Sequence, residues 1–359
     1  MTELSPAHVR SGLVMTVDGP VPSAALGVTL MHEHLQNDCR CWWNPPTDPE
    51  RAHLAEGPVR VGILGELRQD PFANRDNCAL DDLAAAIDEA GAFARAGGRT
   101  IVDPTCRGIG RDPLKLRAIA AGTGLNVVMG AGYYLHTSFP PGFDRLSEDA
   151  IADEIVAEAL HGVDGTDARI GLIGEVGVSS DFTAGEARSL RGAARAMVRT
   201  GLALMVHLPG WFRFGHRVLD VVEAEGGDPA RVVLCHMNPS HGDPAYQEAL
   251  ARRGAFIEYD MMGMDYFYAD QGVQCPSDEE VTPAILRLAD RGFADRLLLS
   301  QDVFLKMMLS RHGGNGYAYV LRHVLPRLRR HGADDALIDR LMVFNPCRVF
   351  DAAFEESRA

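Results

Sequence analysis

Side chains that can bind a metal ion stand at the C-terminal ends of five short apolar runs in this sequence. They are His32 with His34, Glu175, His207, His236 and Asp302. In a parallel β/α barrel, side chains at the C-terminal ends of the strands point into one shared cavity. Imidazole nitrogens and carboxylate oxygens are ligands that zinc accepts, with manganese, cobalt and nickel as alternatives. The arrangement therefore predicts a metal centre inside such a barrel.

His32 and His34 are two residues apart, so on a strand their side chains point to the same face, with Cα atoms about 6.5 Å apart. Taken alone, such a pair is better explained by surface histidines or by histidines satisfied in the core. The ligand-type residues at four further run ends favour a metal site. Two ions about 3.5–4 Å apart need a bridging carboxylate because their charges repel each other. Glu175 is the candidate for that bridge.

The elements that would position these residues are short runs of β-type residues alternating with longer amphipathic segments, which is the pattern of repeated βα units. The expected strands span residues 28–35, 99–104, 126–131, 170–176, 203–208, 231–237, 255–260 and 297–302. Most of these runs are apolar throughout, as expected for strands covered on both faces. Eight such units predict an α/β fold, specifically a closed (β/α)8 TIM barrel.

The segments between the strands carry helix signals. Apolar residues recur at helical spacing over residues 80–95 and 146–160. Thr183 with Glu186 predicts a capping box at the start of a helix that ends near residue 199. Ser277 with Glu280 predicts a second capping box, on a helix that ends near residue 291.

Two regions lie outside the regular units. Residues 15–26 predict a short N-terminal β ribbon, and residues 37–77 form a long first loop that contains Trp42. A loop of that length is a functional lid or pocket wall, or else a disordered excursion. We find no linker or repeat that divides the chain, and expect one domain over residues 1–359 with the barrel at about 28–345.

Composition limits the class of protein. The formal net charge is −14 and the isoelectric point about 5.4, which disfavours nucleic acid and membrane surfaces as partners. A small-molecule substrate is expected instead. The 7 scattered cysteines do not suggest a disulfide framework, and the first residues show no signal for secretion, so we expect a cytoplasmic protein.

Further motifs accompany the metal-binding residues. They are TLMHEHL at 29–35, GIGRDP at 108–113, NVVMGAGYY at 126–134, SQD at 300–302, GGNGY at 313–317 and NPCRVF at 345–350. Together with His207 and His236, these motifs resemble the phosphotriesterase-related family of the amidohydrolase superfamily. The resemblance extends over nearly the whole chain.

The resemblance implies a binuclear metal hydrolase on a (β/α)8 barrel. His32, His34 and Asp302 would hold a buried ion, and His207 with His236 a more exposed one. The residue on the fourth strand and a hydroxide would bridge both. The best-known members use a carbamylated lysine there, but the only lysines of this chain are Lys115 and Lys306, and neither is near that strand. Glu175 resembles the branch of the family in which a glutamate bridges the metals directly.

This resemblance, with general metal chemistry, sets the expected reaction. Two cations lower the pKa of a bridging water towards about 7, which supplies a hydroxide nucleophile at neutral pH. Asp302 would act as general base and then as general acid. We expect cleavage of a carboxylic ester or lactone, with phosphotriester cleavage as a side activity and a homodimer as the assembly. The alternatives are an amidase acting on an N-acyl amide, a non-catalytic metal- or small-molecule-binding barrel, and a metal-assisted lyase or isomerase.

Substrate-binding residues are less clearly marked. Tyr134, Arg107 and Trp211 are the candidates, because each follows an expected strand. Packing explains the tyrosine equally well, a simple water-excluding lid explains the tryptophan, and ion pairs at the barrel rim are the commoner role for Arg107 and its neighbour Arg111.

Two acidic residues at the end of the seventh expected strand complete the predicted site. Glu258 and Asp260 are expected to orient the metal-binding histidines.

Overall fold

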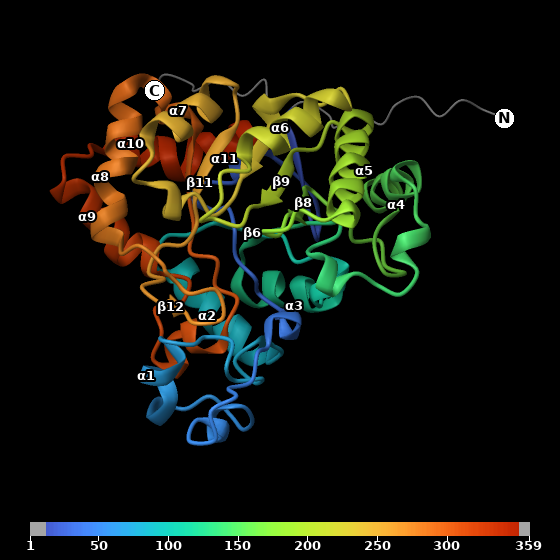
Figure 1. The fold of residues 1–359 in the computed structure, drawn as a ribbon. Coiled ribbons are helices and arrows are strands. Elements are labelled where there is room, and N and C mark those ends of the chain that lie inside the picture. The colour runs from blue at the N-terminus through green and yellow to red at the C-terminus, as the bar shows by residue number, and fades with distance from the viewer. Residues whose placement is uncertain (1–11, 352–359) are drawn as a thin grey trace.

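The computed structural model describes residues 12–351, and its core is a ring of parallel strands surrounded by helices (Figure 1). The barrel strands are β3 (Thr29–Leu30), β6 (Thr100–Asp103), β7 (Asn126–Met129), β8 (Ile173–Gly177), β9 (Leu204–His207), β10 (Val232–Leu234), β11 (Phe256–Tyr259) and β14 (Leu297–Leu299). Each lies within or overlaps one of the eight expected runs. The predicted (β/α)8 barrel is therefore confirmed.

The ring closes through hydrogen bonds between two regular arcs. One arc has the strand order β14-β11-β10-β9-β8 and the other β3-β6-β7. Between β7 and β8, the N–H of Gly171 donates to the carbonyl oxygen of Met129 (3.0 Å). Between β14 and β3, the N–H of Asp302 donates to the carbonyl oxygen of His32 (3.0 Å). The second of these bonds joins two predicted metal ligands, so the closure of the barrel also positions the site.

Helices cover the outside of the barrel. They are α2 (Leu83–Arg95), α3 (Pro113–Thr123), α4 (Glu148–His161), α5 (Ala184–Thr200), α6 (Gly215–Ala224), α7 (Pro244–Arg252), α8 (Asp278–Leu288), α9 (Leu325–Arg330), α10 (Asp335–Asp339) and α11 (Asn345–Phe350). The capping box of α5 is present: Thr183 accepts from the N–H of Glu186 (3.2 Å), and Glu186 accepts from the N–H of Thr183 (2.8 Å). Among residues 12–351, no helix combines the length and the apolar character that a membrane span requires.

The second expected capping box also opens a helix, with a different end. The carboxylate of Glu280 accepts from the N–H of Ser277 (2.8 Å) at the start of α8. The α-helix ends at Leu288, before the expected residue 291, and continues as a π turn over Ala289–Phe293. Gly292 in that turn has φ +92°, which only glycine adopts without strain.

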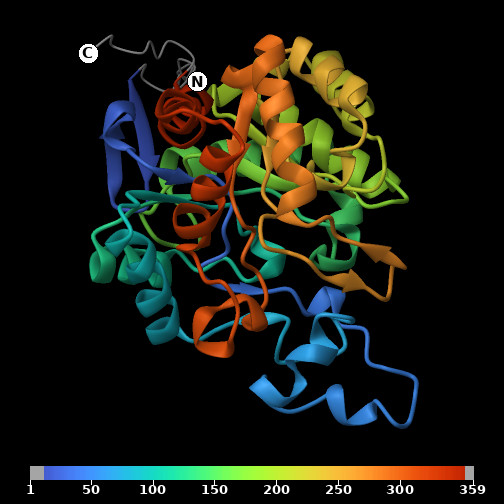
Figure 2. The same cartoon turned by 90° about the vertical axis from the view of Figure 1, so that its left-hand side faces the viewer.

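The N-terminal ribbon consists of β1 (Leu13–Thr16) and β2 (Gly19–Pro22), which pair antiparallel. It begins earlier and ends earlier than the predicted range 15–26, because residues 23–25 form a 3-10 turn. Figure 2 shows the ribbon beside α11. The carbonyl oxygen of Ser23 accepts from the Cys347 thiol (3.1 Å), which ties the start of the described chain to its end.

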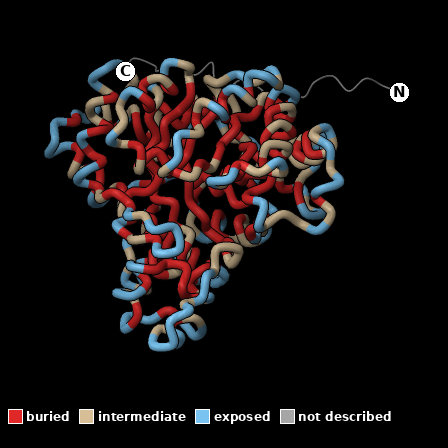
Figure 3. Tube along the Cα trace, viewed as in Figure 1, coloured by how far each residue is buried: buried red, intermediate tan, exposed pale blue. Residues whose placement is uncertain are grey.

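The long first loop is an ordered excursion from the barrel. Its base is a short antiparallel pair, β4 (Asn37–Asp38) with β5 (Ala79–Leu80). The one α-helix within it is α1 (Leu64–Leu67), among several 3-10 turns. Figure 1 shows the excursion extending away from the barrel, and Figure 3 shows that its tip is exposed while its base is buried.

The barrel interior changes character along the strands. Near the N-terminal ends of the strands it is filled by apolar side chains, including Val102, Met205, Val233, Phe256 and Leu298. Near the C-terminal ends, charged and imidazole side chains take their place. The candidate site therefore lies at the C-terminal ends of the strands.

Candidate metal centre

Glu175 at the end of β8 is the centre of the candidate site. Its Oε1 lies 3.3 Å from His34 Nε2, and its Oε2 lies 3.1 Å from His207 Nδ1. Oε2 also lies 3.6 Å from His32 Nε2 and 3.7 Å from His236 Nε2. All four imidazoles predicted as metal ligands therefore surround one carboxylate.

Asp302 completes the set from the opposite side. Its Oδ1 is 3.6 Å from His32 Nε2 and 3.3 Å from His34 Nε2, and its Oδ2 is 4.0 Å from His236 Nδ1. The structure thus brings together all the residues predicted from their positions at the ends of apolar runs.

The described ligand-type side chains form four overlapping groups, of which one joins His32, His236 and Asp302 and another joins His32 with Cys235, Glu258 and Asp260. The remaining two groups share one residue. One group is His32, His34 and Glu175, and the other is Glu175, His207 and His236. Within each group, the candidate ligand atoms lie within 4.8 Å of one another. Two neighbouring ions with a carboxylate between them fit this arrangement.

The hydrogen bonding of His32 gives an independent test of that fit. Its imidazole is fully buried, and its Nε2, which faces Glu175 and Asp302, has no hydrogen-bond partner among the described residues. A buried polar atom left in this way carries a desolvation cost that binding to a metal ion removes. The donor set of nitrogen and carboxylate oxygen atoms is also the one that zinc accepts.

Strained backbone holds two of the ligands in place. His236 has φ +59° and Asp302 has φ +49°, in the left-handed region that residues other than glycine seldom adopt. Such a conformation costs roughly 1–3 kcal/mol and persists where the surroundings impose it. Here the N–H of His236 donates to both carboxylate oxygens of Asp260 (2.9 Å each). The N–H of Asp302 donates to the carbonyl oxygen of His32, as described above.

The charges of the ligands depend on one another. Burial raises the pKa of Glu175, but the imidazoles of His32, His207 and His236 outweigh burial and hold that pKa well below its usual range. Burial lowers the pKa of His236, but the carboxylate of Asp260 outweighs burial and raises it to about 10. The bridge candidate is therefore an anion at neutral pH.

Glu258 and Asp260 lie behind the ligands, as predicted. Asp260 Oδ1 is 3.1 Å from His236 Nδ1, and Asp260 Oδ2 is 3.3 Å from His32 Nδ1. Glu258 Oε2 is 3.6 Å from His32 Nδ1. Contacts of this kind fix the orientation of an imidazole whose other nitrogen faces a metal.

The sequence did not single out two other supporting residues. Thr105 Oγ1 is 2.7 Å from His34 Nδ1. Glu33 accepts from the Ser300 hydroxyl (2.8 Å) and from the N–H of Val303 (2.9 Å), which braces the chain on both sides of Asp302. Burial raises the pKa of Glu33 to about 7. The only sequence signal for Glu33 is its place between His32 and His34.

A cavity of about 620 Å³ opens over the ligand set. Tyr134 and Trp211, two of the predicted substrate-binding residues, line it. The Tyr134 ring packs edge-on against the ring of His207, with centroids 4.8 Å apart, and its hydroxyl accepts from the Trp42 indole N–H (3.2 Å). The first loop is thus a wall of this cavity, one of the two roles expected for it.

Arg107 does not line that cavity, contrary to its predicted role in binding substrate. Its side chain is 46% exposed and pairs with Glu158 of α4 (2.8 Å). Arg111 pairs with Glu158 (2.8 Å) and with Asp164 (3.1 Å). The alternative of ion pairs at the barrel rim therefore describes both arginines, because α4 brings an acidic side chain to them.

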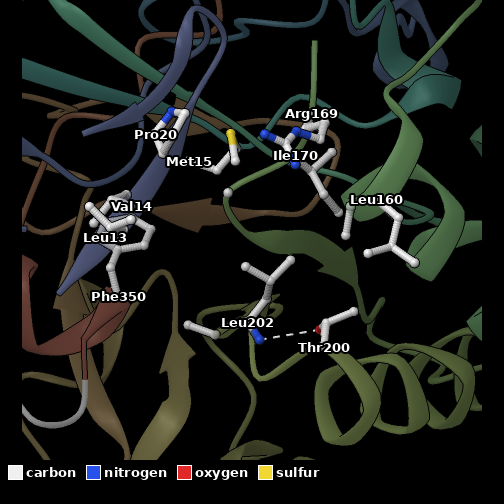
Figure 4. A pocket seen from close by; sticks show the side chains of 13 residues that line it. Leu13, Val14, Met15, Pro20, Leu160, Arg169, Ile170, Thr200, Leu202 and Phe350 are labelled. Carbon is white, nitrogen blue, oxygen red and sulfur yellow. Dashed lines mark hydrogen bonds between the residues drawn. The ribbon is translucent and has the colours of Figure 1, made fainter. Parts of the chain in front are cut away.

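A second cavity, of about 420 Å³, lies at the other end of the barrel, beside the residues that precede β8 and β9. Figure 4 shows apolar side chains such as Leu13, Leu160 and Phe350 around it, with Arg169 at its edge. The hydroxyl of Thr200 accepts from the N–H of Leu202 (3.2 Å). This cavity has no group of metal ligands or nucleophiles among its lining residues, so the chemistry lies at the C-terminal ends of the strands.

The sequence profile described as "Phosphotriesterase family" matches residues 12–350. The chain belongs to the phosphotriesterase family. It is a metal-dependent hydrolase, as the resemblance implied.

Individual relatives cover almost the whole chain. An N-acetyltaurine hydrolase of Tetraodon nigroviridis is 34% identical over 340 residues, which are 94% of this chain and 97% of that one. The crystal structure of a resiniferatoxin-binding protein from Rhodobacter sphaeroides is 73% identical, with a TM-score of 0.97 over 99% of both chains. A mutant organophosphorus hydrolase from Deinococcus radiodurans is 28% identical, with a TM-score of 0.74 over 96% of this chain and 98% of that one.

Proposed function

We propose that this member of the phosphotriesterase family is a binuclear hydrolase of carboxylic esters or lactones, in which Glu175 bridges two divalent ions. The observation that carries the proposal is the sharing of Glu175 between two groups of metal ligands. In this proposal His32, His34 and Asp302 would hold one ion, and His207 with His236 would hold the other. Zinc is the proposed metal, because it suits nitrogen and oxygen ligands.

The bridge in this proposal needs no modification. The ζ-nitrogen of Lys306 forms a close pair with Asp76 in the first excursion and is 3.1 Å from Asp81, which follows β5. Lys115 lies on α3, 3.8 Å from Asp112. Neither lysine is placed to be carbamylated between the ions, so activity is expected to be independent of added bicarbonate.

When bound, the ions would lower the pKa of a water and polarise the substrate carbonyl. The other steps belong to residues of the chain. Asp302, between both ligand groups and at the floor of the cavity, accepts the proton of the attacking water and delivers it to the leaving oxygen. Glu175 stays ionised throughout, and Tyr134 limits the space over His207.

An N-acyl amide is the second candidate substrate. It is favoured by the curated relatives named N-acetyltaurine hydrolase, which match over 94% of this chain. An amine must be protonated before it leaves, so this reaction asks more of Asp302 than ester cleavage does. The name of the relative from Rhodobacter sphaeroides describes ligand binding and no reaction. If the present chain bound a ligand tightly and left it unchanged, that result would oppose the proposed hydrolysis.

The test is turnover of matched esters, lactones and amides by the full chain loaded with zinc. We expect ester or lactone cleavage that is lost on chelation and restored by zinc, with oxygen-18 from solvent appearing in the acid product. Turnover of amides alone would move the assignment to the second candidate. Product without solvent oxygen would point to a lyase or isomerase, and tight binding without turnover to a carrier.

Several further expectations stay predictions: the single domain, the homodimer and the cytoplasmic location. The first residues of the chain, on which the expected lack of a secretion signal rests, lie outside the described residues.

A further inference from the structure

The cavity over the ligand set has few basic side chains. No arginine or lysine is among the described residues that line it. Its basic side chains are imidazoles: three belong to the ligand set, and the fourth, His136, is 3.0 Å from the carboxylate of Glu186. The cavity away from the metal centre therefore offers no free cation to a substrate.

Acidic side chains occupy the outer part of the same cavity. Asp181 and Asp270 line it, and neither forms an ion pair with a described residue. Burial, and then the charge of Asp70, raise the pKa of Asp270 above its ordinary value. A negative group on a substrate would approach these carboxylates without a compensating charge, which makes its binding unfavourable.

Aromatic rings form one continuous wall between this outer part and the metal ligands. Trp42 stacks on Phe72 with centroids 5.3 Å apart, and Phe72 contacts Tyr268 (5.6 Å) and Phe304 (6.2 Å). Tyr268 then contacts Trp211 (5.9 Å). At its inner end, the wall reaches His207 through the Trp42–Tyr134 hydrogen bond described above. A ring bound against the wall would stack or meet these rings edge-on.

We propose that the substrate is a bulky aromatic ester or amide that carries no negative charge. Its ring lies against the wall formed by Trp42, Phe72, Tyr268, Phe304 and Trp211, and its carbonyl lies over Glu175 and Asp302. The position of the substrate carbonyl in this inference rests on the proposed function. The aromatic ring and the absence of negative charge on the substrate rest on the lining of the cavity alone.

Four esters test the preference for an aromatic ring and the exclusion of negative charge separately. They are the 2-hydroxyethyl and 2-sulfoethyl esters of phenylacetic acid and of acetic acid, so that ring and sulfonate vary independently. We expect kcat/KM to be at least about 10-fold higher with the phenyl ring, from the apolar surface buried. We expect it to be about 100-fold lower with the sulfonate, from an unpaired charge. The corresponding amides of ethanolamine and taurine repeat the comparison for the other bond type.

A variant in which one acidic residue of the cavity is replaced by a basic one tests the charge preference from the side of the protein. Asp270→Arg places a guanidinium at the outer part of the cavity and is expected to raise kcat/KM for the sulfonate probes about 10-fold, with little change for the uncharged ones. The matched control is Asp290→Arg, an exposed position in the π turn after α8 that does not line the cavity. Equal changes in both variants, or no gain in Asp270→Arg, would overturn the charge assignment.

A binding measurement distinguishes failure of this inference from failure of the proposed function. Quenching of the cavity tryptophans by the eight probes is measured on the zinc-loaded Asp302→Asn protein. If no probe is cleaved by the natural protein but binding follows the expected order, the proposed function fails and the inference stands. If cleavage occurs with the sulfonate or the acetyl probes preferred, the inference fails and the proposed function stands. If no probe binds or is cleaved, both are contradicted.

Discussion

The two halves of the barrel interior differ in what their side chains do, although the same strands supply both. Along β9 the inward series runs from Ala203, just before the strand, through Met205 to His207. Along β14 it runs from Leu298 to Ser300 and Asp302, which follow the end of the strand. Each step of two residues is about 6.5 Å along a strand. One step therefore separates the part of the barrel that stabilises the fold from the part that carries the chemistry.

Energetics explains why the halves are kept apart. Apolar side chains in the N-terminal half gain roughly 1.5–3 kcal/mol each from burial. In the C-terminal half, the two carboxylate oxygens of Glu258 and the Nε2 of His32 are buried without a hydrogen-bond partner among the described residues. Such groups cost stability unless a ligand or ion meets them. We expect changes in the C-terminal half to alter activity or metal binding, and changes in the N-terminal half to alter stability.

The largest expected effect is on activity. Asp302→Asn removes the proton acceptor and one ligand oxygen, and should lower kcat roughly 10³-fold, since acid–base groups contribute about 10²–10⁴. The melting temperature should change little. Steady-state kinetics with the best ester, together with a thermal melt, checks both. The control Asp290→Asn alters the same functional group on the surface, and a similar loss there would contradict the role of Asp302.

The opposite half should respond in stability. Phe256→Ala leaves a cavity beneath the site and should lower the free energy of unfolding by about 3–5 kcal/mol, because Phe256 is fully buried. The zinc content of the folded protein should stay unchanged. Urea unfolding measures the free energy of unfolding, and elemental analysis measures the zinc content. Phe212→Ala is the control, since Phe212 is 46% exposed and its loss should cost less than about 0.5 kcal/mol.

The layer behind the ligands should show an intermediate effect. Asp260→Asn replaces the carboxylate that contacts His236 and His32, and should weaken zinc binding about 10–100-fold. Competition with a chromogenic chelator measures this affinity. Unchanged zinc affinity in a folded variant would show that Asp260 does not orient the imidazoles.

The smallest expected effect lies outside the barrel interior. Asp76 pairs with Lys306 and accepts from the N–H of Val59 (2.9 Å), which attaches the excursion to the segment after β14. Partial burial raises the pKa of Asp76, but Lys306 outweighs burial and lowers it below the ordinary value of 3.8. The stabilisation is therefore present above about pH 4 and lost as pH falls through the lowered pKa.

Asp76→Asn accordingly should cost about 1 kcal/mol at pH 7 and less near pH 3. Denaturant unfolding at both pH values gives the difference. Asp81→Asn is the comparison, because Asp81 also contacts Lys306 but is 58% exposed, so its effect should be smaller. A loss that grows as the pH falls would contradict this assignment.

The sequence predicted the barrel and the ligand set for a physical reason. Strand ends that are buried on both faces leave an imidazole or carboxylate few positions other than the shared cavity, so His207 and Asp302 could be placed from their local runs alone. The strands themselves are shorter than expected: the structure has β3 only over Thr29–Leu30, because His32 and His34 lie on irregular backbone.

Contacts that depend on distant segments were less accessible from the sequence. Arg107 was misplaced because its partner Glu158 comes from α4, some fifty positions later in the chain. The aromatic wall combines Phe72, Tyr268 and Phe304, which lie on three segments far apart in the sequence with no shared spacing; Tyr268 belongs to the short strand β12 (Phe267–Tyr268). The same holds for the positive φ of His236, which depends on the carboxylate of Asp260 on the neighbouring strand.

The central claim is that Glu175 joins two metal ions between four imidazoles, which come from the ends of β3, β9 and β10. Anomalous diffraction from crystals of the zinc-loaded protein tests it most directly. We expect two zinc peaks about 3.5–4 Å apart, one beside each oxygen of the unmodified Glu175 side chain. A single peak, or two peaks with Glu175 turned away from them, would contradict the claim.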